Sequence, residues 1–348
     1  MKTINCLKIL EEFHSSLNFI QGHKDMEVQG PGDPKSTDGN LLLFIHSEKF
    51  LNDLPQDRQV LIVSENLVDL AKSKNPKLLI STKNINLAQS VICKKFFPIV
   101  VKQIGENLIH ASVCLGDNSK IGEGTSIGPN VVIGHNVSIG RNCKIKPNTV
   151  IEDGTSIGDS THIHALVYIG PNTKIGNFCE VHPNTSIGSE GFGFANDNTG
   201  AFHRIPHYGI VEIHDYVEIG SNVSIDRGKV ENTVLHEGTK IDNHCHIAHN
   251  VKIGKHSGIT AGFIVAGSTT IGDHFTCGGR TSVTGHIKIT DKVQLGAVST
   301  ALKNIENPGN YAGFPLQPHG DAIRTQASLP ALPKLKRQVA KILKKLDL

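Results

Sequence analysis

The stretch KIGEGTSIGPNVVIGHNVSIGRNCKIKPNTVIEDGTSIG, residues 120–158, repeats one pattern every six positions. An isoleucine recurs at Ile121, Ile127, Ile133 and each sixth residue onward, and glycine often follows it. Four positions after each isoleucine stands a smaller residue, such as Thr125 or Val131. A period of six fits neither an amphipathic helix nor simple strand alternation, but it suits very short strands separated by corners.

The physical solution is a prism with three flat faces, with one hexapeptide on each face and about 18 residues in each coil. The large aliphatic residue fills the interior, the small residue packs beside it, and Gly or Asn supplies the positive φ that the corners need. The spacing extends over most of residues 109–295. We therefore expect nine or ten stacked coils, forming a column of roughly 45 Å at about 4.8 Å per strand.

Two insertions interrupt the repeat, and both flanks lack it. The longer insertion, SEGFGFANDNTGAFHRIPHYGIVE, follows Gly188, and a shorter one, DRGKVENTV, follows Ile225. Such loops on a rigid scaffold commonly carry function. Residues 1–105 alternate apolar runs with helical stretches and predict a small α/β domain. The repeat domain spans 106–306, and 307–348 predicts an extended segment followed by two helices, one near 320–329 and one at about 333–346.

Composition narrows the class of protein. The formal charge of +3 is too small to imply a nucleic-acid partner, and the chain has no apolar run long enough to cross a bilayer. The N-terminus lacks the pattern of an export signal. Seven cysteines without a C-x-x-C pair favour reduced thiols over disulfides or a zinc framework. We expect a cytoplasmic protein without a transmembrane segment.

Coil arithmetic selects a small group among the 19 histidines. His249 stands two residues after the inward Ile247, so its side chain points outward near a corner. One coil later the same position is Gly267, and two coils later it is Gly285, directly before His286. These residues should line one edge of the prism, beside small outward residues that would let an acyl or pantetheine chain lie close to the wall.

This geometry suggests an acyl-transfer site without a bound metal. His249 would be a general base because histidine titrates near neutrality, and Asp242 would orient its ring. The Gly267 N–H would stabilise an oxyanion, and His286 lies on the same edge of the prism. A metal interpretation of His244, His246 and His249 is the alternative, although residues at this spacing on flat strands do not converge without a neighbouring chain.

The motifs GSEGFGF (188–194), IDRG (225–228), KIDNHCHIAHN (240–250), VTGH (283–286) and YAGFPLQP (311–318), in this order, resemble the UDP-3-O-acylglucosamine N-acyltransferases of lipid A biosynthesis. The resemblance implies a mainly β fold, a left-handed parallel β-helix with a small N-terminal α/β domain and C-terminal helices. It also implies transfer of a 3-hydroxyacyl chain from the thioester of acyl carrier protein to the 2-amino group of UDP-3-O-acyl-glucosamine, in a homotrimer with active sites between prisms.

The resemblance further implies roles for particular residues. His249, Asp242, Gly267 and His286 would be catalytic, Asn243 would lie along the acyl or pantetheine path, and Phe192 and Phe194 would line the pocket for the acceptor's acyl chain. Ser47 and Phe50, where the family has Asn and Tyr, would contact uridine in the N-terminal domain. Lys303 and the last helix, with Lys341, Lys344 and Lys345, would bind acyl carrier protein. His207 stands where the family has Gln.

No cofactor is expected beyond the phosphopantetheine that the carrier protein brings. Two other activities stay open, and so does a non-catalytic role as a scaffold or binder. An O-acyltransferase acting on a nucleotide sugar uses the same kind of prism, although it normally begins directly with the repeat. A zinc-dependent hydratase would instead use metal-binding histidines.

Overall fold

The computed structural model describes residues 3–35, 38–54, 60–98, 108–313 and 319–346. The chain divides into two compact units, Met1–Gln103 and Ile104–Leu348. The predicted boundary between residues 105 and 106 and the last part of the YAGFPLQP motif, residues 314–318, lie outside the described residues.

The first unit is a five-stranded sheet with helices packed on it. Its strand order is β2 (Asn18–Gly22), β7 (Leu78–Thr82), β6 (Val60–Ser64), β5 (Leu41–Ile45) and β4 (Gly30–Pro31), in which β2 is antiparallel to β7 and the other pairs are parallel. A short pair, β1 (Ile4–Asn5) and β3 (Glu27–Val28), lies outside this sheet. The predicted apolar runs LLLFI, QVLIVS and KLLIST thus form the three central strands.

Alternate residues of these strands enter two separate apolar clusters, because successive strand side chains point to opposite faces. Leu42, Phe44 and Ile62 pack with residues of α1 (Cys6–Glu12) and α4 (Ile85–Phe96). Leu43, Ile45 and Leu61 pack with residues of α2 (Glu48–Asn52), the short helix η1 (Glu65–Leu67) and α3 (Val68–Lys72). The predicted mixed α/β unit is therefore present, with a core on each side of the sheet.

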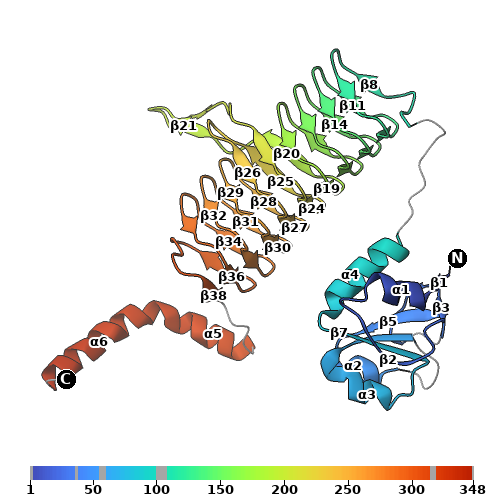
Figure 1. Ribbon diagram of the computed structural model, residues 1–348. Helices are drawn as coiled ribbons and strands as arrows, with labels where there is room; N and C mark the ends of the chain where they lie inside the picture. Colours follow the sequence, from blue (N-terminus) through green and yellow to red (C-terminus); the bar gives the residue numbers. More distant parts are fainter. Residues whose placement is uncertain (1–2, 36–37, 55–59, 99–107, 314–318, 347–348) are drawn as a thin grey trace. The chain divides into compact units, whose positions relative to one another are not determined.

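The repeat forms a parallel β-helix with three faces (Figure 1). Face 1 contains β8 (Cys114–Leu115), β11 (Val132–Ile133), β14 (Val150–Ile151), β17 (Tyr168–Ile169), β20 (Ser186–Glu190), β25 (Ser224–Arg227), β28 (His246–Ile247), β31 (Ile264–Val265), β34 (Ser282–Val283) and β37 (Thr300–Ala301). Face 2 contains β9 (Lys120–Ile121), β12 (Ser138–Ile139), β15 (Ser156–Ile157), β18 (Lys174–Ile175), β23 (Val211–Ile213), β26 (Thr233–Leu235), β29 (Lys252–Ile253), β32 (Thr270–Ile271) and β35 (Lys288–Ile289). Face 3 contains β10 (Ser126–Ile127), β13 (Lys144–Ile145), β16 (His162–Ile163), β19 (Glu180–Val181), β24 (Glu218–Ile219), β27 (Lys240–Ile241), β30 (Gly258–Ile259), β33 (Thr276–Cys277), β36 (Val293–Leu295) and β38 (Gly309–Tyr311).

Faces of ten, nine and ten strands agree with the nine or ten coils expected from the repeat. The isoleucine ladder is buried in one continuous core, and the small residues beside it are buried as well. Many of these are threonines whose hydroxyl donates to a carbonyl of the next coil, as in the 2.7 Å bond from Thr125 to Gly140. Two positions expected to be small hold Phe263 and Phe275, which are fully buried with ring centroids 6.1 Å apart and fill the interior together.

The corners use a wider set of residues than the expected Gly and Asn. Asn118, Asn130 and Asn136 have φ near 60°, but so do Leu166 and Phe178. The regular ladder of interstrand hydrogen bonds fixes the corner conformation, so it holds even bulky side chains in a region that they rarely adopt alone.

The insertions leave the column without disturbing its register. In the longer one, β21 (Phe194–Asn196) and β22 (Phe202–Arg204) form an antiparallel hairpin that projects from the side of the column (Figure 1). After it, β23 pairs with β18 across a separation of 38 residues. The C-terminal part contains α5 (His319–Ser328), the short helix η2 (Leu329–Ala331) and α6 (Leu332–Lys345), close to the predicted helices. Among the helices in the described ranges, none has the length and apolarity needed to span a bilayer.

Candidate functional site

His249 and Gly267 are stacked at the corner between faces 1 and 2. His249 follows β28, and a Cβ atom added to Gly267 would lie 2.5 Å from Cε1 and 2.8 Å from Nε2 of the His249 ring. The backbone continues the stack, because Ser268 N donates to His249 O and His286 N donates to Gly267 O, both at 3.0 Å. The alignment of His249, Gly267 and His286 predicted from coil arithmetic is therefore present.

The ring of His249 is oriented by its neighbour Asn250. His249 Nδ1 lies 2.9 Å from Asn250 Oδ1, while Asn250 Nδ2 donates to the carbonyl of Glu231 at 2.8 Å. Because the Nδ2 group has a carbonyl partner, Oδ1 must be the atom facing the ring, so Nδ1 carries the proton. The neutral imidazole then has a free lone pair on Nε2.

Gly267 offers a free hydrogen-bond donor at this point. Within the described part of the chain, its backbone N–H donates to no acceptor, and the missing side chain leaves space for the His249 ring. A half-buried imidazole and an unpaired amide N–H thus lie on one edge of the column; these are the kinds of group that act as base and oxyanion donor in acyl transfer.

Asp242 is at a different corner, between faces 3 and 1. It is seven residues before His249, which in a six-residue repeat places it one corner earlier. Its Oδ1 accepts from Asn243 N at 2.7 Å and its Oδ2 from Ala261 N at 3.1 Å. Within one chain, the residue that orients His249 is therefore Asn250 and not Asp242, contrary to the prediction.

Asp242 and Asn243 instead line a groove of about 760 Å³ on face 3, together with His182, Glu218 and Lys240. Asn243 Oδ1 accepts from Ser221 N at 2.7 Å, which fixes its amide against the wall. Asn243, predicted to lie along the acyl or pantetheine path, thus lines this groove. The groove and His249 are at opposite edges of face 1.

A buried polar cluster adjoins His249. The ring of His207 is 5.5 Å from that of His249 at an interplanar angle of 70° and is 5% exposed. Its Nδ1 faces the carbonyl of Ile205 at 3.1 Å, and its Nε2 has no hydrogen-bond partner. Burial lowers the pKa of His207, and the charge of His249 lowers it further. His207 is therefore predominantly neutral at pH 7.

Asp226 of the IDRG motif belongs to the same cluster. It is buried, and burial raises the pKa of its carboxyl group even though His246, His249 and His207 favour the ionised form. Its Oδ2 lies 3.7 Å from Nε2 of His246. The GSEGFGF loop covers this cluster closely, because a Cβ on Gly191 would lie 2.7 Å from Asp226 Oδ2 and one on Gly193 would lie 2.5 Å from His207 Cε1.

The aromatic residues of the loop form an exposed group. The rings of Phe192 and Phe194 are 5.0 Å apart, Phe202 lies 6.0 Å from Phe194, and Arg204 stacks over Phe194 at 5.0 Å. Phe192 is 75% exposed, so an apolar surface is available at the predicted acyl pocket.

The predicted uridine residues lie at the start of α2. Ser47 is its N-cap residue but makes no capping hydrogen bond with its side chain. Phe50 is half-buried, and its ring packs edge-on against His46 with centroids 4.9 Å apart. His46 was not among the residues predicted from the sequence.

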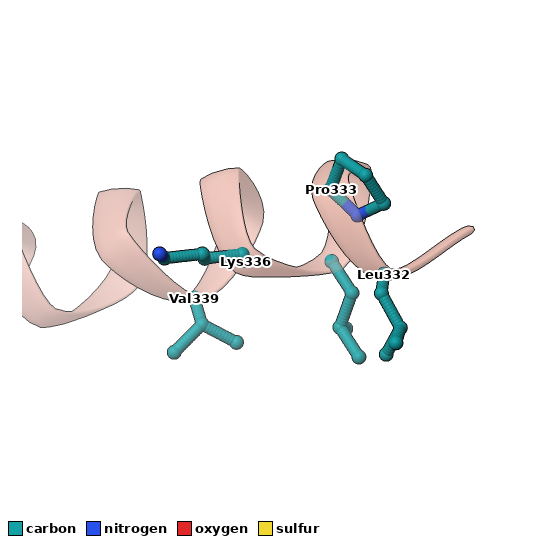
Figure 2. A pocket seen from close by; sticks show the side chains of 5 residues that line it. Leu332, Pro333, Lys336 and Val339 are labelled. Carbon is teal, nitrogen blue, oxygen red and sulfur yellow. The ribbon is translucent and has the colours of Figure 1, made fainter. Parts of the chain in front are cut away.

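Of the lysines predicted to bind the carrier protein, Lys303 lies at the end of the β-helix and the other three lie on the last helix. Lys303 lines a cavity of about 1200 Å³ at the end of the β-helix, together with Leu302, Asn304 and Tyr311. Lys341, Lys344 and Lys345 are exposed on α6. Figure 2 shows Leu332 and Val339 projecting from one side of that helix and Pro333 from the opposite side.

The three histidines of the alternative zinc site lie at successive positions along one coil. His244 lies at a corner with φ 59°, His246 lies on β28 beside Asp226, and His249 faces Asn250 at the next corner. In the described ranges, three His, Cys, Asp or Glu ligand atoms converge within 4.8 Å at His164, Glu180 and His182 instead.

Sequence reasoning gave no role beside His249 to Asn250, His207 or Asp226, although the quoted motifs and the departure at residue 207 include them. Asn250 could have been found, because it directly follows His249 at a corner position. His207 arrives through the long insertion, where no periodicity indicates its location.

The comparisons with known proteins agree with this fold. The domain family described as "GMPPB C-terminal domain" matches residues 104–191. The chain is 42% identical over 157 residues to the UDP-3-O-acylglucosamine N-acyltransferase of Bordetella avium, covering 44% of each chain. It is 47% identical over 128 residues to the enzyme of the same name from Herminiimonas arsenicoxydans, covering 37% of this chain and 36% of that one.

The matches therefore span less than half the length of these curated relatives. Among solved structures, the Arabidopsis UDP-N-acetylglucosamine acyltransferase matches with a TM-score of 0.53 and 26% identity, over 59% of this chain and 71% of that one. The resemblance to the N-acyltransferases inferred from the motifs is confirmed, as is the parallel β-helix fold.

Proposed function

We propose that the chain is an N-acyltransferase of lipid A biosynthesis. It would move a 3-hydroxyacyl chain from the thioester of acyl carrier protein to the 2-amino group of UDP-3-O-acyl-glucosamine. The observation that carries this proposal is the pairing of His249, which has a free Nε2 lone pair, with the unpaired N–H of Gly267. The names of the relatives supply the substrate class.

In the proposed mechanism, Nε2 of His249 accepts a proton from the attacking amine, whose nitrogen bonds to the thioester carbonyl carbon. Asn250 holds Nδ1–H in place and accepts a hydrogen bond from the resulting imidazolium. The tetrahedral oxyanion accepts from the Gly267 N–H, and collapse expels the pantetheine thiolate, which His249 can reprotonate. His286 would assist near the thioester or the sugar phosphate, from two coils beyond His249.

Particular residues would contact the substrates. Phe192 and Phe194 offer apolar surface to the acceptor's acyl chain, and Asn243 would border the acyl or pantetheine path. Phe50 would stack on uracil, with Ser47 beside it. Asp242 would act on His249 from a neighbouring copy, since within one chain it lies at another corner.

We further propose a cytoplasmic location, because reduced thiols are stable there and all seven cysteines are unpaired.

A homotrimer is part of the proposal, and α6 offers a surface for association between copies. An exposed apolar stripe repeats with spacings of three and four residues: Leu332, Leu335, Val339, Ile342 and Leu346. This spacing is that of a coiled-coil seam, along which copies of α6 would pack. Sedimentation of a Leu335→Asn/Ile342→Asn variant should show weaker association than that of a Lys334→Asn control.

The decisive assay is mass spectrometry of the product formed from UDP-3-O-acyl-glucosamine and a mixture of acyl carrier protein thioesters. The amide product is expected, and His249→Ala should lower kcat by at least roughly 10²-fold while the fold persists. His214→Ala, at a different corner, is the matched control. Unchanged turnover in His249→Ala would exclude this mechanism.

An O-acyltransferase is the second candidate, because the structural match is to a UDP-N-acetylglucosamine acyltransferase. An ester product from UDP-N-acetylglucosamine in the same assay, without an amide from the amine acceptor, would favour it. Hydration of an unsaturated substrate, dependent on zinc at His244, His246 and His249, would instead favour the hydratase.

A further inference from the structure

His164 and His182 occupy equivalent positions on adjacent coils of face 3. Each follows the last residue of a strand, His164 after β16 and His182 after β19, and 18 residues separate them. Their rings are stacked, with centroids 4.7 Å apart and an interplanar angle of 12°. The backbone is fixed by the ladder, since His164 N donates to Val181 O and His182 N donates to Ile219 O, both at 2.8 Å.

Glu180 places a carboxylate oxygen between the two rings. Its Oε1 lies 2.8 Å from His164 Nε2 and 3.8 Å from His182 Nε2, and the three ligand atoms all lie within 4.8 Å of one another. Ligands of a tetrahedral zinc ion with bonds of about 2.0–2.1 Å are roughly 3.3 Å apart. Side-chain rotations on a fixed backbone could therefore bring these atoms around one ion.

The charge of Glu180 suits a cation. Its carboxylate is acidic and already contacts Nε2 of both histidines. Lys144 and Lys146, on the preceding coil of face 3, oppose a cation through their positive charges. The side chains of all three candidate ligands are 31–41% exposed, so an ion can reach them from solvent.

We propose that His164, Glu180 and His182 form a binding site for a first-row divalent cation such as Zn²⁺. Two imidazole nitrogens and one carboxylate oxygen are a donor set that zinc uses in sites with an open coordination position. His182 also lines the face 3 groove with Asp242 and Asn243, so the fourth ligand would be water or a polar group of the groove's occupant. The proposal does not depend on the acyltransfer chemistry.

The site is separate from the proposed base. His249 lies at the corner between faces 1 and 2, whereas His164 and His182 lie at the corner between faces 3 and 1. It is also distinct from His244 and His246. Metal binding here can thus be tested without any assay of turnover.

The experiment is calorimetric titration of the chelator-treated full chain with ZnCl₂, together with Co²⁺ absorption spectroscopy as a report on ligand geometry. One ion per chain is expected, with low-coordinate Co²⁺ bands. His182→Ala and Glu180→Gln should each weaken binding by more than roughly 10-fold. Circular dichroism would verify that the variants are folded.

The matched control is His214→Ala. His214 and His236 hold the same coil position on face 2, with rings 4.8 Å apart, but they are not part of a converging group with a carboxylate. This control should keep the affinity of the unchanged chain. The proposal is overturned if the unchanged chain fails to bind Zn²⁺ or Co²⁺, or if His182→Ala and Glu180→Gln bind as tightly as the control.

Discussion

The imidazole ring of His249 lies so close to Cα of Gly267 that a Cβ atom there would be 2.5 Å from ring carbon Cε1. The two residues are 18 positions apart and meet because each coil of the β-helix stacks directly on the preceding one. The contact joins the proposed base to an amide donor on one edge of the column, and any side chain added at residue 267 would meet the His249 ring.

Gly267→Ala should displace the His249 ring while retaining the backbone N–H. A shift of about 1 Å in a reacting group can cost roughly 10²-fold in rate, and we expect a fall of kcat of that order. Steady-state kinetics with the unchanged substrates would measure it. Gly279→Ala is the control, since a Cβ there meets its nearest neighbour, the Ala261 carbonyl, at an acceptable 3.4 Å. Equal kcat in both variants would contradict this account.

Asn250→Asp should move the acid limb of the pH–rate profile to higher pH. A carboxylate facing Nδ1–H stabilises the imidazolium more than the present amide does, so the base stays protonated to a higher pH. Asp tolerates the positive φ of 61° at this position, so the corner should persist. The profile of kcat/KM against pH would test this, with Asn222→Asp at a distant corner as the comparison. A profile unaffected by the change at residue 250 would mean that Asn250 does not orient the base.

His207→Gln should make stability less dependent on pH. Because burial lowers the pKa of His207 in the folded chain, the unfolded state binds its proton at higher pH than the folded state does. The free energy of unfolding therefore falls as pH drops through about 6.5, and glutamine removes this contribution. His249, Glu190, Lys229 and Asp226 also face this residue and remain in the variant.

Thermal unfolding at about pH 7.5 and about pH 5.5 would measure the difference. The unchanged chain should lose more Tm on acidification than His207→Gln does. His23→Gln, at an exposed histidine of the N-terminal unit, should behave like the unchanged chain. Identical losses in all three proteins would show that His207 does not titrate as its burial implies.

Reversing the charges of Lys341, Lys344 and Lys345 to Glu should raise KM for acyl carrier protein, most strongly at low salt. Exposed cations steer an acidic partner, and salt screens that attraction. The measurement is KM at two ionic strengths, with Lys72→Glu/Lys74→Glu/Lys77→Glu in the N-terminal unit as the control. If KM is insensitive to the reversal, α6 does not bind the carrier protein.

The column and its aligned residues were predictable because the hexapeptide period alone fixes which residues meet. A spacing of 18 residues brought Gly267 onto His249 and His286 beside them without knowledge of any side-chain contact. The same arithmetic should have excluded Asp242 as the partner of His249 within one chain, since seven residues in a six-residue repeat carry it to another corner.

The buried cluster around His207 and Asp226 was not predictable in this way. His207 reaches the site through an insertion that follows no period, and its environment depends on how the glycines of the GSEGFGF loop pack over it. The choice of Asn250 as ring partner depends on an amide orientation that the Glu231 carbonyl determines. Such contacts arise from local packing and not from the spacing of residues.

Because the coils stack regularly, the number of coils before a residue determines its position along the axis of the β-helix. Removing one entire coil between β9 and β15 would shift everything downstream along the axis by about 4.8 Å and leave its orientation unchanged. Removing a single hexapeptide from the same region would instead rotate the downstream part by a third of a turn relative to the upstream part. Insertions or deletions therefore keep every downstream edge facing the same way only when they comprise three hexapeptides or a multiple of three.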